Sequence, residues 1–213
     1  MRIVRKTFKK ISLLTLSGSV LMSCAPSNNN NAPVTARPNN PITTVAAVPD
    51  LLGTWTKPCA GGGTTGTSKN QFVVEADKLQ IQDLVFENNR NCSGVADLES
   101  HAIFGYSVDQ FVAGRINPIN LKLQKVLARL NTSRGIAIAN TTSFCGEKDW
   151  QINTDKDVTG KNCLANVPAV GETYFQIFKV SASELFIGEV NTQHTGRTAE
   201  SRPVVLETTS YKK

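Results

Sequence analysis

The acidic stretch Asp155-Lys156-Asp157-Val158-Thr159-Gly160 is the best candidate metal site in the sequence. Asp155, Asp157 and Thr159 would place oxygen ligands at alternate positions before a glycine, as in the first half of a calcium loop. The position that needs a bidentate Glu is Asn166, however, and Cys163 falls inside the loop. We therefore favour a turn in which the Asp side chains bond their own backbone, with calcium as the alternative.

Patterns that indicate an enzyme are incomplete. Gly61-Gly62-Gly63 lacks the spacing of a phosphate-binding loop, and residues 105–109 lack the last glycine of a GxSxG turn. His101 alternates with acidic residues on the polar face of an expected strand, where we expect it to be solvated. His194 has no recognisable partner. We expect no catalytic residues, no metal and no cofactor.

The first 24 residues have the pattern of an export signal. A basic stretch precedes a short apolar run, and Leu21-Met22-Ser23-Cys24 closes the segment. This ending resembles the lipobox of bacterial lipoproteins, which implies that Cys24 becomes the first mature residue and carries the lipid. Ala25 follows instead of Asp, which by the same resemblance favours the outer membrane, with the protein facing the periplasm or the cell surface. The alternative is an ordinary signal peptide.

The composition changes sharply after this segment, which divides the chain into three parts. We expect a signal peptide at 1–23, a lipidated and disordered tether rich in Asn and Pro at 24–49, and a folded domain at 50–213. The formal charge of +6 comes mostly from five basic residues before position 11, and the remainder has 18 basic and 17 acidic side chains. A nucleic-acid partner is therefore not expected.

The folded domain shows the two-residue period of half-buried strands. Hairpins are expected at 72–82 and 174–190, with a β-bulge near Asp83. Further strands are expected at 95–108 and 203–211, and a short helix at 133–141. Residues 117–131 fit a helix or a strand that shifts at Lys125, and we favour the strand. The fold class is mainly antiparallel β, and closing a barrel would best protect the strand edges.

Four cysteines remain besides Cys24, and in an exported domain an even number indicates disulfides. Of the three possible pairings we prefer Cys59–Cys92 and Cys145–Cys163, because each joins segments that flank one hairpin or loop. The alternative is a zinc ion bound by all four thiolates, although no CxxC pair is present.

Gly53-Thr54-Trp55 opens the first expected strand directly after the tether. This motif, followed by antiparallel hairpins and one helix, resembles the lipocalins and their calycin relatives. The resemblance implies an up-and-down barrel closed at one end by Trp55, with a basic residue of the last strand packed across it. Lys212 would take that role here, or alternatively Arg202. The chain also resembles a group of small bacterial lipoproteins that contain, in this order, a GTWxxxC segment, a second Cys and a CGxxxW segment. Here these are Gly53–Cys59, Cys92 and Cys145–Trp150.

Two classes of function remain. In the first, the barrel is filled by its own side chains and acts as a structural or interaction module, with an envelope protein as partner. In the second, the barrel binds a small apolar ligand, because barrel mouths are common ligand sites. We favour the filled barrel, because the expected inward residues are large. They are Phe72, Leu79, Ile81, Phe86, Leu98, Phe104, Tyr106, Phe175, Ile177, Phe178, Leu185 and Ile187. In either case the membrane is reached through the lipid on Cys24.

Overall fold

The computed structural model describes residues 48–63, 66–87, 89, 91–161, 163–164 and 169–213. They belong to a compact unit that spans Val45–Lys213. The expected signal peptide, Cys24 and the tether as far as residue 47 lie outside the described residues. No helix in the described part of the chain is long and apolar enough to cross a membrane.

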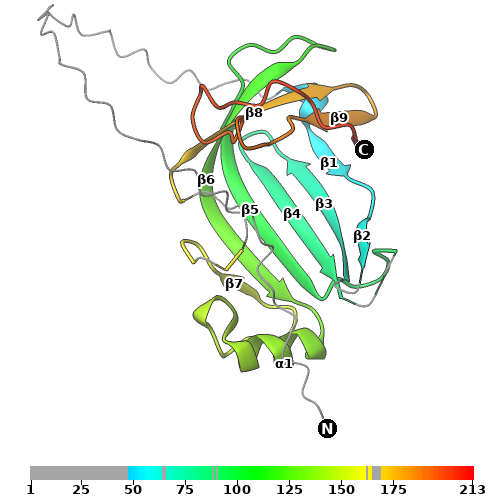
Figure 1. Cartoon of the computed structure of the whole chain (residues 1–213), viewed down its shortest axis with the longest axis vertical. Helices are drawn as coiled ribbons and strands as arrows, with labels where there is room; N and C mark the ends of the chain where they lie inside the picture. The colour runs from blue at the N-terminus through cyan, green and yellow to red at the C-terminus, as the bar shows by residue number, and fades with distance from the viewer. Residues whose placement is uncertain (1–47, 64–65, 88, 90, 162, 165–168) are drawn as a thin grey trace, which may run out of the picture. The chain divides into compact units, whose positions relative to one another are not determined.

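The fold is a closed antiparallel barrel with one helix (Figure 1). Neighbouring strands follow the order of the chain, and the pairing of β1 with β3 closes a ring of eight. The ring contains β1 (Gly53–Thr56), β3 (Gly66–Val74), β4 (Leu79–Phe86), β5 (Leu98–Ser107), β6 (Asn117–Leu130), β8 (Thr173–Val180), β9 (Glu184–Ile187) and β10 (Tyr211–Lys212). This arrangement confirms the up-and-down barrel.

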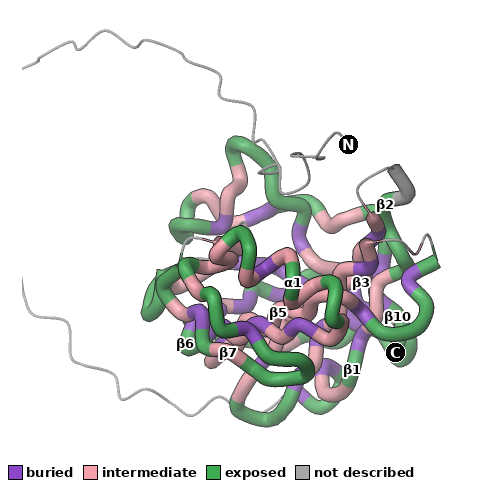
Figure 2. The backbone as a smooth tube through the Cα atoms, turned by 90° about the horizontal axis from the view of Figure 1, so that it is seen from below, coloured by how far each residue is buried: buried purple, intermediate pink, exposed green. Residues whose placement is uncertain are grey.

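Short elements extend the ring at its two ends. A 3-10 turn, η1 (Pro49–Leu51), precedes β1 at one end, which we call the closed end. At the far end β2 (Ala60–Gly63) pairs with β3, and β7 (Asp155–Asp157) pairs with β6. The helix α1 (Ser133–Thr142) and the 3-10 turn η2 (Phe144–Gly146) also lie there (Figure 1). Viewed from this far end, exposed segments surround the buried ones (Figure 2).

The expected strand at 117–131 is confirmed, together with its shift. Residues 117–130 form β6, and the β5–β6 register changes between Ile103 and Phe104, which pair with Lys125 and Leu123. The two hairpins and the helix are confirmed as well. The helix begins where the Thr132 hydroxyl accepts a hydrogen bond from the Gly135 amide, 3.1 Å away.

The expected bulge near Asp83 is wrong, because β3–β4 and β4–β5 pair without interruption through that residue. The apolar residues that suggested it lie on the outer face of β4. There Phe86 packs with Cys92 and Ala96 in a second cluster, and Leu84 lies against that cluster. A loop thus covers apolar side chains outside the barrel.

The expected strand at 203–211 is also wrong, because only Tyr211 and Lys212 form β10. The residues before it cross the outside of the barrel as a loop and bridge to Gly188 through Leu206. Pro203 lies so close that a Cβ on Gly188 would meet it at 2.7 Å. A proline has no backbone N–H to donate to a strand ladder, which disfavours regular pairing at this position.

Candidate functional site: the barrel interior and its ends

Trp55 seals the closed end of the barrel. Its side chain is fully buried, and its indole Nε1 donates a hydrogen bond to the Leu51 carbonyl, 2.8 Å away in η1. Lys213 Nζ lies 4.9 Å from the centre of the Trp55 ring. Gly53 is needed here, because its φ is +121° and a Cβ would meet Lys213 Cε at 3.0 Å. The turn, the ring and the lysine together close this end.

The basic residue across Trp55 is therefore Lys213, and the assignment of that role to Lys212 is wrong. Side chains alternate between the two faces of a strand, so Tyr211 points inward and Lys212 outward. Lys212 makes an ion pair with Glu184 on the outside. The alternative, Arg202, lies elsewhere on the barrel wall.

The interior behind Trp55 is nearly full. The cavity there has a volume of about 50 Å³, which is far below the roughly 300–1,000 Å³ of sites for small ligands. Phe178 and Leu185 on its wall are fully buried, and the rings of Phe72 and Tyr211 meet edge to face with centroids 4.8 Å apart. The other lining residues are Leu51, Leu79, Ile81, Ile119, Leu121, Tyr174, Gln176 and Ile187. A fatty acid does not fit in this space.

Three of the expected inward residues point outward. Phe178 faces the interior, so the alternation of β8 places Ile177 and Phe175 on the outer face and brings Gln176 inside. Gln176 Nε2 donates a hydrogen bond to the Gly188 carbonyl at 3.3 Å. Phe86 belongs to the outer cluster on β4. In β8, apolar residues occupy both inward and outward positions, so the sequence alone does not show which positions face the interior.

A polar cluster faces the interior beyond the cavity. Asn70 and Asp83 pair across β3 and β4, two positions from Phe72 and Ile81 and on the same face. Asn70 Nδ2 donates a hydrogen bond to Asp83 Oδ1 at 3.0 Å. Burial raises the pKa of the Asp83 carboxyl above its ordinary value, and the bond from Asn70 lowers that pKa in part. The inward position of this carboxyl was not predicted, because the outer apolar residues of β4 resemble those of a bulged strand.

Tyr211 extends this cluster toward β1. Burial holds the pKa of its phenol above the usual range, and the charges of Glu207 and Asp83 add to that effect. Lys57 makes an ion pair with Glu207, and its ammonium group lies 5.3 Å from the centre of the Tyr211 ring. The cluster thus ties β1, β3, β4 and β10 together. It contains no pairing of a nucleophile with a base.

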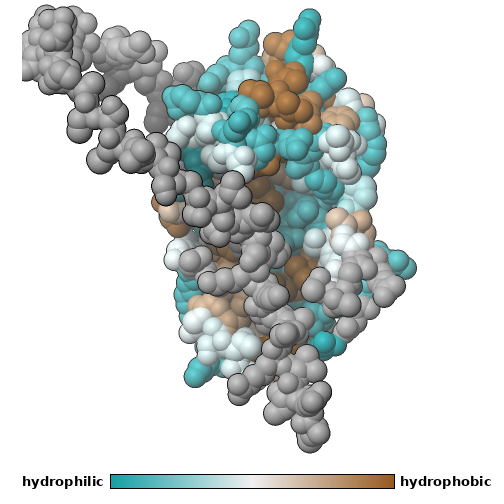
Figure 3. All heavy atoms as spheres, viewed as in Figure 1, coloured by the Kyte–Doolittle hydropathy of each residue, from teal (hydrophilic) through white to brown (hydrophobic). Residues whose placement is uncertain are grey.

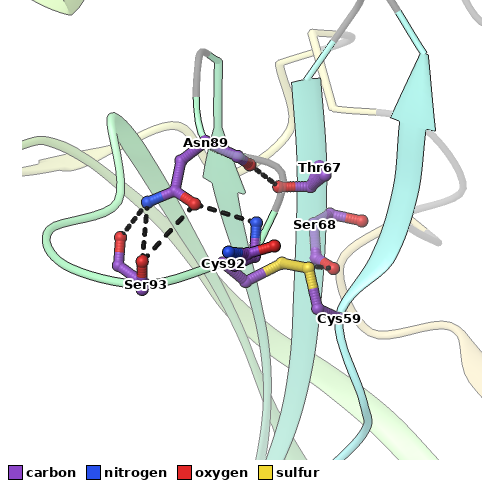
Figure 4. Close-up of a disulfide and its surroundings, with 7 residues drawn as sticks. Cys59, Thr67, Ser68, Asn89, Cys92 and Ser93 are labelled. Atoms are coloured by element: carbon purple, nitrogen blue, oxygen red, sulfur yellow. Dashed lines mark hydrogen bonds between the residues drawn. A yellow bond between two sulfur atoms is a disulfide. The ribbon is translucent and has the colours of Figure 1, made fainter.

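Both preferred disulfides are present. Cys59 joins Cys92 with the Cα atoms 5.6 Å apart, and Cys145 joins Cys163 with the Cα atoms 4.9 Å apart. The first bond fastens the loop after β4 to the segment before β2 (Figure 4). Asn89 stabilises this loop, because its side chain accepts from the Asn91 amide at 2.9 Å and donates to Ser93 Oγ at 3.0 Å.

The second disulfide fixes the segment that carries Trp150. The Trp150 amide donates to Asn140 Oδ1 at 2.8 Å, and its indole Nε1 donates to the Phe144 carbonyl at 3.2 Å. Lys156 Nζ lies 5.2 Å from the centre of the Trp150 ring and pairs with Glu147 and Asp149. Trp150 is buried. It therefore serves as the core of the far end.

The three candidate calcium ligands make other contacts in the structure. Asp155 accepts two hydrogen bonds of 2.8 Å from Arg129, which hold the pKa of its carboxyl below the ordinary value. Asp157 accepts from the Thr159 amide at 3.0 Å, as the turn interpretation expected. Thr159 Oγ1 is bonded to the backbone of Val126. Asn166 lies outside the described residues, within which no group of three acidic, His or Cys side chains could hold a metal.

Within the described part of the chain, the two histidines form no catalytic arrangement with other side chains. His101 is on the outer face of β5 with its Nε2 3.4 Å from Glu99 Oε2, and its side chain is only 16% exposed. The expected solvated position is thus wrong. His194 lies in a loop where its amide donates to Asn191 Oδ1 at 2.8 Å.

Arg202 has a structural role that was not predicted, because it was expected only as the alternative residue across Trp55. Its Nη1 donates to the carbonyls of Ile119 and Gln176 at 3.0 and 2.6 Å, and Nη2 donates to Asn120 Oδ1 at 2.7 Å. The guanidinium carbon lies 5.2 Å from the centre of the Phe175 ring. Burial lowers the pKa of Arg202. This side chain clamps the loop that precedes β10 onto β6 and β8.

Comparisons with known proteins give no further guide to identity. No family model matches this chain. No curated protein matches it either.

Proposed function

We propose that the chain is an outer-membrane lipoprotein whose barrel acts through its surface, as a structural or interaction module of the cell envelope. The observation that carries this proposal is the filled interior behind Trp55, where the cavity has a volume of only about 50 Å³. A barrel that stores an apolar ligand needs several times that volume. The surface is then the part of the domain that remains available to partners.

Two further features support export and anchoring. Two disulfides are typical of proteins that fold in an oxidising compartment. They also occupy every cysteine except Cys24, which leaves that residue available for acylation in a sequence similar to a lipobox. Several acyl chains on one residue anchor a protein stably, whereas a single chain binds a membrane reversibly.

The anchoring is tested by replacing Cys24. We expect the Cys24→Ser chain to move from the detergent phase to the aqueous phase on phase separation, and metabolic labelling with a fatty acid to disappear. Ser27→Ala, three residues later, is the matched control and should stay in the detergent phase with its label. Retention of the label in Cys24→Ser would contradict the proposed anchor.

The filled barrel is tested on the same soluble Cys24→Ser chain. Native mass spectrometry of the purified, oxidised protein should give the mass of the polypeptide alone, and organic extraction should release no stoichiometric lipid. A bound fatty acid at one molecule per chain would instead support the second function, an apolar-ligand binder of the lipocalin kind.

A further inference from the structure

The hairpin that joins β5 and β6 projects at the closed end of the barrel (Figure 1). We call residues 109–116 the hairpin tip. Val112 and Ile116 are 46% and 52% exposed. In the space-filling view, hydrophobic side chains gather where this hairpin lies (Figure 3). The tip contains one acidic and one basic residue, Asp109 and Arg115, so it has no formal net charge.

The tip is a fixed turn. Asn117 at its base is buried, and its Oδ1 accepts a hydrogen bond from the Val112 amide at 2.7 Å. Its Nδ2 donates to the carbonyls of Val112 and Arg115 at 3.1 and 2.8 Å. Gly114 supplies the positive φ, +70°, that the turn requires. The apolar side chains are thus presented on an ordered support.

A second contact holds the tip against the barrel. The ring of Phe111 stacks on that of Phe178, with the planes 5° apart and the centroids separated by 6.2 Å. Phe178 is fully buried in the barrel wall. An apolar tip that is preorganised in this way loses little conformational entropy when it binds a surface.

The tip lies at the end where the chain enters the barrel. Tyr106, near the end of β5, donates its hydroxyl hydrogen to the Glu75 carbonyl in the β3–β4 turn at 2.9 Å. Gly53, the first residue of β1, pairs with Val74 beside that turn. Val48 and η1 come directly before β1. The hairpin tip and Val48 are therefore at the same end of the barrel.

We propose that the hairpin tip contacts the lipid bilayer in which Cys24 is anchored. This inference rests on the proposed function for its anchor. The 23 residues between Cys24 and Val48 reach about 25–30 Å as a coil and roughly 70 Å as a polyproline II segment, so the closed end can reach the membrane surface. Such a tether raises the effective concentration of the tip at the membrane, and a weak apolar contact then becomes populated.

Other exposed valines lack this combination. Val95 is 69% exposed, but it lies in the loop between β4 and β5 at the far end. Val190, Val204 and Val205 lie near β9 on the side of the barrel, where the Glu189 amide donates to the Val205 carbonyl. Val95 is therefore the control for a tryptophan placed at position 112.

The test attaches the chain to vesicles independently of acylation in the cell. Residues 24–213, with both disulfides formed, are coupled through the Cys24 thiol to a maleimide lipid in phosphatidylethanolamine and phosphatidylglycerol vesicles. The tryptophan emission spectra of the coupled Val112→Trp and Val95→Trp chains are then compared. The two natural tryptophans, Trp55 and Trp150, are buried and supply a constant background.

After subtraction of the emission of the two natural tryptophans, we expect a blue shift and at least twofold quenching by brominated acyl chains for Val112→Trp, and neither for Val95→Trp. Adding Ile116→Asp to Val112→Trp should abolish the quenching. Because the tip has no net charge, the quenching should persist at high salt and in vesicles without phosphatidylglycerol.

Equal spectra for the coupled Val112→Trp and Val95→Trp chains would overturn the proposal. A blue shift of Val112→Trp that rises with protein concentration in the absence of vesicles would overturn it too, because the tip would then bind a second copy. Coupling makes both results independent of whether the cell acylates Cys24. Failure of the proposed anchor is thus distinguished from failure of the tip contact.

Discussion

Lys213 places its ammonium group 4.9 Å above the centre of the Trp55 ring, whereas Lys212 points away from the barrel to Glu184. One step along the chain thus separates a lysine that lies over a buried ring from one that makes an ion pair on the outside of the barrel. The two lysines offer a comparison in which the residue type is the same and only the face differs.

Lys213→Ala should lower the free energy of unfolding by about 1 kcal/mol, because a cation over a buried indole is stabilising and its aliphatic stem covers the ring. Lys212→Ala should cost less than about 0.5 kcal/mol, because it removes an exposed ion pair. Denaturant unfolding monitored by Trp emission measures both. Equal losses, or a larger loss for Lys212→Ala, would contradict the placement of Lys213.

Asp83→Asn should stabilise the protein near neutral pH. Burial raises the pKa of Asp83 in the folded state, so between the unfolded and the folded pKa the folded protein keeps a proton that the unfolded chain has released. The stability that this proton provides is complete below about pH 4 and is lost as the pH rises through the raised folded pKa. The denaturation midpoint of Asp83→Asn should therefore exceed that of the wild type at pH 7 and match it near pH 3.

Asp155→Asn is the control, because its effect on the stability at pH 7 should have the opposite sign. Hydrogen bonds from Arg129 lower the pKa of Asp155, so its contribution is present above about pH 4 and is lost as the pH falls through the lowered folded pKa. The variant should lose about 0.2–1 kcal/mol at pH 7, as expected for a half-exposed pair. The account of Asp83 would be wrong if the two variants changed stability in the same direction at pH 7.

Arg202→Met should loosen the loop that precedes β10. The substitution removes three hydrogen bonds from a half-buried guanidinium, and we expect a loss of about 2 kcal/mol. Hydrogen exchange should accelerate at the Phe175 and Glu207 amides, which bond across this region. Arg197→Met is the control, because Arg197 is mostly exposed and lies 4.0 Å from Glu172. Unchanged exchange in Arg202→Met would show that the clamp is dispensable.

Much of the fold was predictable because the signals are local. The two-residue period gave the long strands, the shift at Lys125 matched a real register change, and loop proximity gave both disulfide pairs. Most of the large side chains that were expected to fill the interior face it, and the exceptions are Phe86, Phe175 and Ile177. These features depend on neighbours in sequence, which is why they could be read from the chain alone.

The errors share a different physical origin. In β8 the apolar residues Phe175, Ile177 and Phe178 occupy both phases, so alternation alone does not say which face is inside. In β4 the outer residue Phe86 is covered by the loop of Cys92, which made an uninterrupted strand resemble a bulged one. Both cases depend on which loop packs on the outside of the barrel. That packing is a tertiary contact without a local signal.

The central claim is that the barrel is filled, and a titration with an apolar naphthylamine fluorophore tests it most directly. The oxidised Cys24→Ser chain is used, with Phe178→Ala as a positive control that enlarges the cavity at its wall. Apolar cavities on the order of 150 Å³ bind small aromatic molecules, so the control should bind benzene. We predict no saturable binding of the fluorophore by the Cys24→Ser chain at micromolar concentration. Saturable one-to-one binding that a fatty acid displaces would contradict the filled barrel.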